Sequence, residues 1–102
     1  MALLHTVNKS PFDKNSLSDC LRRATSGSTV LLIEDGVYGA LENTTVSEQI
    51  LDRNNELKFC ALAPDLAARG LSEKPLIDGL TLVDYDGFVD LVEECSSVQS
   101  WL

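Results

Sequence analysis

Short apolar segments alternate along this chain with stretches that have the period of a helix, and this alternation constrains the fold more than any other feature. We predict strands over residues 2–7, 29–34, 57–62 and 80–83. Helices are predicted over residues 16–25, 36–41, 45–53, 64–69 and 84–95. Residues 98–102 form either a short fifth strand or an interface tail. The order of strands and helices is typical of an α/β fold around a mostly parallel sheet.

Two segments carry local signals that sharpen this prediction. Residues 29–34 are apolar at consecutive positions, which a strand buried on both faces requires. Ser16 is the predicted N-cap of the first helix, with Asp19 three residues later in an arrangement like a capping box. The helix then presents one apolar stripe, which consists of Leu17, Cys20, Leu21 and Ala24.

Length and charge limit the classes of function. The chain has 102 residues, which is enough for one domain, residues 1–102, and for one core. Sixteen acidic residues against eight basic ones give a formal charge of −8, so direct binding to nucleic acid is not expected. The acidic excess serves either solubility or the docking of a basic partner.

The cysteines and the apolar runs indicate a compartment. Residues 1–5 are too short for a signal core, and the apolar run at residues 30–33 is too short to cross a membrane. Three cysteines without a Cys-x-x-Cys pair fit neither a zinc ribbon nor a thioredoxin motif. We therefore expect a cytoplasmic protein with free thiols and no membrane contact.

The carboxyl ends of the predicted strands are where ligands gather in an open parallel sheet. Two of these ends are acidic, and no glycine-rich phosphate loop is present, so we expect no nucleotide cofactor. The single histidine, His5, is interpreted as structural, and no serine-nucleophile motif accompanies it. A metal site is conceivable, although acidic turns are more often helix caps and solvated rims, and none is predicted. The acids concerned are Glu34, Asp35, Asp84 and Asp86.

The thiols remain as candidates for chemistry. Cys20 lies one turn past the proposed cap, where the helix dipole and Arg23 would favour a thiolate and Asp19 would oppose it. The alternative is that Cys20 is a buried member of the apolar stripe. Cys60 lies within a predicted strand and fits the core, and Cys95 ends the last helix, where the dipole disfavours a thiolate.

Several segments, taken in order, resemble the DsrH/TusB family of DsrE-fold proteins over essentially the whole chain. This resemblance implies a single-domain α/β/α sandwich with about five strands in a mostly parallel sheet. It also implies a subunit that needs no cofactor and works in a hetero-oligomer. The segments that carry it are residues 4–12, 31–38, 62–70, 83–89 and 98–102.

The resemblance further implies partners and a role for Cys20. Family members assemble with DsrE-like and DsrF-like subunits, two copies of each chain, and carry sulfur as cysteine persulfide. In one branch sulfur passes to a DsrC-like acceptor during oxidation of stored sulfur; in the TusBCD branch it serves 2-thiolation of the tRNA wobble uridine. Cys20 matches the cysteine of DsrH-type members, which favours the oxidation branch. It is expected to be an accessory to a partner's persulfide cysteine.

Two other interpretations stay open. The chain could be a purely structural subunit of the same assembly, with Trp101 either anchoring the interface or closing its own core. A stand-alone sulfurtransferase of the rhodanese type needs a cysteine in a loop of inward-pointing amides, and none of the three cysteines has that context.

Overall fold

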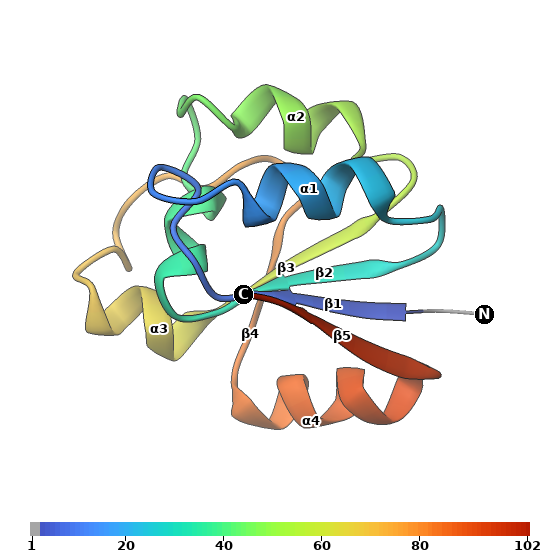
Figure 1. Cartoon of the computed structure of the whole chain (residues 1–102). Coiled ribbons are helices and arrows are strands. Elements are labelled where there is room, and N and C mark those ends of the chain that lie inside the picture. Colours follow the sequence, from blue (N-terminus) through green and yellow to red (C-terminus); the bar gives the residue numbers. More distant parts are fainter. Residues whose placement is uncertain (1–2) are drawn as a thin grey trace.

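The computed structural model describes residues 3–102, and all of its strands lie in one parallel sheet (Figure 1). The strand order is β4-β3-β2-β1-β5, and each of the four neighbouring pairs is parallel. The elements, in chain order, are β1 (Leu3–Val7), α1 (Ser16–Arg23), β2 (Thr29–Leu32), η1 (Glu34–Ala40), α2 (Ser47–Asp52), β3 (Lys58–Leu62), α3 (Ala63–Ala68), β4 (Thr81–Val83), α4 (Tyr85–Glu94) and β5 (Ser97–Trp101).

This architecture confirms the predicted α/β class with a five-stranded sheet. The tail is a strand, β5, which pairs with β1 from Leu3↔Ser97 to Val7↔Trp101. Ala2, the predicted start of the first strand, lies outside the described residues. The second strand is shorter than predicted because Glu34 adopts a positive φ of 49° and starts the 3-10 helix η1, which absorbs most of the predicted helix at 36–41.

Helices cover the two faces of the sheet unequally. Figure 1 shows α1 and α2 over one face and α4 over the other. The larger core lies beneath α1 and α2, and all four residues of β2 are buried, as the sequence predicted for a strand between two layers. A smaller core on the α4 face consists of Leu4, Leu31, Cys60 and Leu91.

The start of α1 differs from the prediction. Asn15 is the N-cap, no side chain caps the helix, and Asp19 forms an ion pair with Arg22. The Ser16 hydroxyl donates instead to the backbone oxygen of Leu102, at 3.1 Å. The predicted capping box is therefore wrong, because a tertiary partner 86 residues away takes the hydroxyl.

The other end of α1 is held by Arg53, the residue that follows α2. Its guanidinium donates to the backbone oxygens of Leu21 and Ala24 and also pairs with Glu56. The last carbonyls of α1, which lack partners within the helix, thus accept charge-assisted hydrogen bonds. This contact joins α1 to α2 over the larger core.

Candidate functional site

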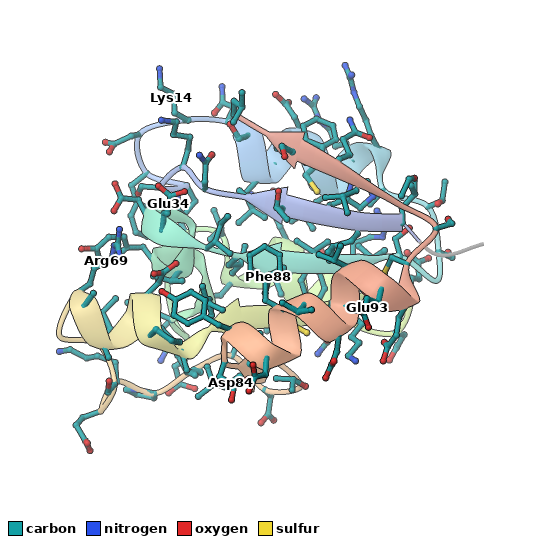
Figure 2. All side chains as sticks on the ribbon, turned by 90° about the horizontal axis from the view of Figure 1, so that it is seen from below. Lys14, Glu34, Arg69, Asp84, Phe88 and Glu93 are labelled. Atoms are coloured by element: carbon teal, nitrogen blue, oxygen red, sulfur yellow. The ribbon has the colours of Figure 1, made fainter. Side chains whose placement is uncertain are left out.

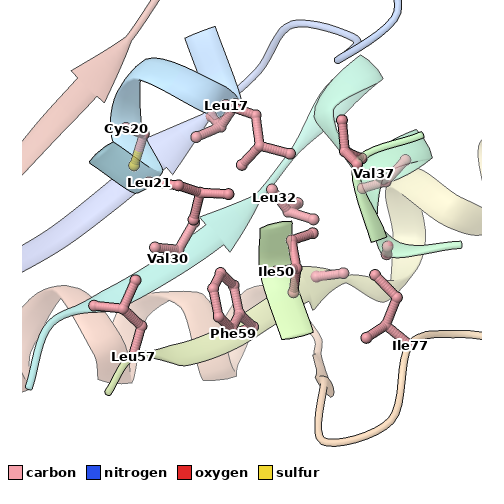
Figure 3. Packing of buried hydrophobic residues seen from close by; sticks show 14 of the residues in the cluster. Leu17, Cys20, Leu21, Val30, Leu32, Val37, Ile50, Leu57, Phe59 and Ile77 are labelled. Atoms are coloured by element: carbon pink, nitrogen blue, oxygen red, sulfur yellow. The ribbon is translucent and has the colours of Figure 1, made fainter. Parts of the chain in front are cut away.

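Cys20 is the fifth residue of α1 and points into the larger core (Figure 3). Its exposed fraction is 0%, and Leu17, Leu21 and Val30 belong to the same buried cluster. Burial raises the pKa of the Cys20 thiol to about 12, and the nearby charge of Arg53 only partly opposes this. Because the thiolate is the nucleophile, a thiol with this pKa is almost wholly unreactive at neutral pH.

The other two cysteines lie on the α4 side of the sheet. Cys60 is fully buried in the smaller core, and burial raises the pKa of its thiol against the opposing charge of Lys58. Its placement confirms the prediction from its position in a strand. Cys95 follows α4 as its C-cap residue and is only partly buried.

We expect the three thiols to differ sharply in reactivity. With a disulfide reagent at neutral pH, Cys95 should be modified first, whereas Cys20 and Cys60 should react at least about 100-fold more slowly, because both must open to solvent and ionise. Mass spectrometry of the peptides that carry the mixed disulfide, sampled over time, measures each rate. A Cys95→Ser variant should then show almost no fast phase, and rapid labelling of Cys20 in that variant would contradict its buried state.

The acidic side chains at the carboxyl ends of the strands form hydrogen bonds and ion pairs with neighbouring residues. Arg69 donates to Asp35 through Nε at 2.9 Å and to the backbone oxygen of Asp65 at 3.1 Å. Asp65 in turn accepts from the backbone N–H of Glu34 at 2.6 Å. Asp84 caps α4 by accepting from the N–H of Gly87 at 2.8 Å, as expected of an acidic turn before a helix. These carboxylates therefore serve as caps and ion-pair partners.

No group of three or more His, Cys, Asp or Glu side chains within residues 3–102 is arranged to hold a metal ion. In the same part of the chain, no helix has both the length and the apolar character that a bilayer crossing needs.

His5 and Trp101 form a pair across β1 and β5. The Trp101 indole donates to Nδ1 of His5 at 3.0 Å, and the two rings lie 6.1 Å apart. His5 is 2% exposed, and burial lowers the pKa of its imidazole, so the ring is neutral at pH 7. Trp101 is partly buried against the larger core, so at least one of its roles is to close that core.

Within the described residues, two of the open pockets lie beside α2, and no cysteine lines either. One, of about 290 Å³, runs between α1 and α2. The other, of about 720 Å³, is polar and acidic, which disfavours an anionic ligand. Its lining residues are Glu42, Asn43, Thr44, Thr45, Ser47, Glu48, Leu51, Ile77 and Asp78.

One surface was not predicted from the sequence. It is the outer flank of α4, where Val92 is 43% exposed and lies with Tyr85 and Val89. The signal was present, since these three residues follow an i, i+4, i+7 spacing of their own.

Known proteins resemble the chain in both sequence and structure. The family model described as "DsrH like protein" matches residues 9–98. Protein TusB from Yersinia pestis (strain Pestoides F) is 37% identical over 99 residues, which cover 97% of this chain and 100% of that protein. Protein TusB from Shigella flexneri is 36% identical over the same lengths.

Solved structures support the same fold. The ychN protein from E. coli superposes with a TM-score of 0.86 at 16% identity, over 98% of each chain. Protein MTH1491 from Methanobacterium thermoautotrophicum superposes with a TM-score of 0.72 at 17% identity, over 96% of each chain. At these identities the likeness concerns the fold alone, whereas the family match and the TusB relatives cover nearly the whole sequence. The chain therefore belongs to the DsrH-like family, with TusB proteins among its relatives.

Proposed function

We propose that this chain is a TusB-like subunit of a hetero-oligomeric sulfur relay that serves 2-thiolation of the tRNA wobble uridine. The similarity to proteins named TusB, at 36–37% identity over 97% of the chain, supports this branch. The resemblance in the sequence had placed the oxidation branch first, with DsrE-like and DsrF-like subunits and a DsrC-like acceptor. That branch is the second candidate, favoured by the cysteine at position 20 and by the DsrH-like family match.

Within the relay, we assign this chain an assembly role and place the persulfide on a partner subunit. Sulfur moves between persulfides when an acceptor thiolate attacks the outer sulfur and the donor cysteine leaves as a thiolate. Cys20 would need to be ionised and reachable for that attack, and its complete burial is the observation that carries this assignment. The accessory role expected for Cys20 would require α1 to move away from the sheet in the complex.

The test is made on the complex, since the isolated chain is not expected to act alone. The chain is co-expressed with the TusC-like and TusD-like subunits of the same organism, and the purified complex receives sulfur from a cysteine desulfurase. Mass spectrometry should find the added sulfur on a partner cysteine and none on Cys20. Cys20→Ser and the control Cys95→Ser should both leave the transfer rate within about twofold of the wild type.

Cellular phenotypes separate the branches. Deleting the gene should remove the 2-thio group from wobble uridines, and a Cys20→Ser copy should restore it. If the deletion spares tRNA thiolation and instead stops oxidation of stored sulfur, the second candidate is correct. If Cys20 gains sulfur within the complex and Cys20→Ser stops the relay, the assembly role is wrong.

A further inference from the structure

The outer flank of α4 exposes large apolar side chains that the fold does not cover. Tyr85 is 59% exposed, Val89 55% and Val92 43%. Val98 of β5 is 46% exposed and pairs with Leu4, which belongs to the smaller core beneath α4. Paired residues of neighbouring strands point to the same face, so Val98 lies on the α4 face of the sheet. We name Tyr85, Val89, Val92 and Val98 the α4–β5 strip.

The strip exists because one helix covers a face that is wider than a helix. The outer strands of a five-stranded sheet lie about 19 Å apart, whereas a helix with its side chains is about 10–12 Å across. The opposite face carries two helices, α1 and α2, but α4 crosses its face alone (Figures 1 and 2). The face beside α4 therefore has space for a second helix.

The charged residues of α4 all have one sign, although Lys58 of β3 adds a cation to the same face of the sheet. Asp86, Asp90, Glu93 and Glu94 occupy the other flank of α4. Residues 75–102 contain six acidic residues and no Lys or Arg, although the chain as a whole has eight basic residues. An apolar strip beside a row of carboxylates is complementary to an apolar stripe that is flanked by basic side chains.

We propose that the α4–β5 strip is the docking surface for a helix of a different subunit, whose apolar stripe is flanked by Lys or Arg. A second copy fits poorly, because a two-fold contact sets the same patches against each other and brings the acids of both α4 helices together. Anionic lipid is repelled for the same reason. This inference rests on the proposed assembly role and adds the surface and the chemistry of the partner.

The location of the docking surface is tested in the co-expressed complex with two matched substitutions. Val89→Arg places a cation on the strip, and Leu51→Arg places one on α2, on the opposite face, at a residue that is 47% exposed. Both change the net charge equally, and both sites are half exposed, so thermal unfolding should stay near that of the wild type. Val89→Arg should weaken the affinity for the partner subunits at least about tenfold, and Leu51→Arg should leave it unchanged.

The partner's charge is tested by salt dependence. The affinity of the wild-type chain should fall as salt rises, and the double variant Asp90→Asn, Glu93→Gln should flatten that dependence. The control Glu48→Gln, Asp52→Asn neutralises two exposed acids on α2 and should retain the wild-type slope.

The outcomes separate this inference from the proposed function. A wild-type chain that forms no complex with the TusC-like and TusD-like subunits contradicts both. A complex that tolerates Val89→Arg leaves the assembly role intact but rejects the strip as its surface. Self-association of the wild type that Val89→Arg abolishes makes a second copy the occupant, and a salt slope unchanged by Asp90→Asn, Glu93→Gln rejects a basic partner.

Discussion

Replacing Cys20 with aspartate is expected to lower the free energy of unfolding by about 3 kcal/mol or more at pH 7, a large part of the stability of a domain this size. The side chain at this position is fully buried in the larger core. A carboxylate there loses its hydration and gains no matching cation, because the guanidinium of Arg53 already binds two carbonyls and Glu56. The aspartate is a probe for the anionic persulfide that a relay cysteine must carry.

The loss in the free energy of unfolding of Cys20→Asp should grow as the pH rises. Burial raises the pKa of the new carboxyl above its unfolded value of about 3.9, so the folded state binds more protons than the unfolded state above that value. Stability is then lost as the pH rises from about 4 through the folded pKa. Urea unfolding of Cys20→Asp, Cys20→Asn and Cys20→Ala between pH 4 and 7 measures this, with the last two as pH-independent controls relative to the wild type.

A Cys20→Asp variant as stable at pH 7 as Cys20→Ala would show that the site accepts an anion. That result would contradict the assembly-only role of this chain and restore Cys20 as an accessory sulfur acceptor.

Replacing Gly36 with alanine is expected to cost at least about 3 kcal/mol, because its new methyl group has no space. A Cβ at Gly36 would lie 2.0 Å from the backbone oxygen of Val7, at the carboxyl end of β1. That oxygen already accepts a hydrogen bond from the N–H of Ile33 at 3.0 Å. The clash is with backbone, so relief requires η1 to move away from the sheet.

The matched control lies in the same 3-10 helix. A Cβ at Gly39 would meet the Leu17 side chain at 3.1 Å and Pro11 at 3.6 Å. A side chain can shift where a strand cannot, so Gly39→Ala should cost less than about 1.5 kcal/mol. Denaturant unfolding monitored by circular dichroism compares the two, and equal losses would contradict the close approach of η1 to β1.

Local pattern in the amino-acid sequence was enough to predict the kind of most elements and the buried stripe of several of them. The period of apolar residues indicates which side of a helix or strand is buried. The burial of β2 on both faces and the burial of Cys60 therefore followed from local pattern. The capping role of the acidic turn before α4 also followed from local pattern, because a cap acts on its own helix, and the structure shows Asp84 as the cap. The parallel sheet followed from the alternation of strands and helices, since parallel neighbours require a crossover.

Features that depend on contacts between segments distant along the chain could be read only from the folded structure. Cys20 is both near a helix start and on its apolar stripe, and the packing of α1 on the sheet decided in favour of burial. The Ser16 hydroxyl does not cap α1, because it donates a hydrogen bond to the backbone oxygen of Leu102. The exposed flank of α4 arises because β5 crosses to the edge beside β1 and leaves one helix on a five-stranded face. The periodicity of apolar residues does not predict how many helices pack on one face of a sheet. The exposed flank of α4 could therefore be identified only from the folded chain.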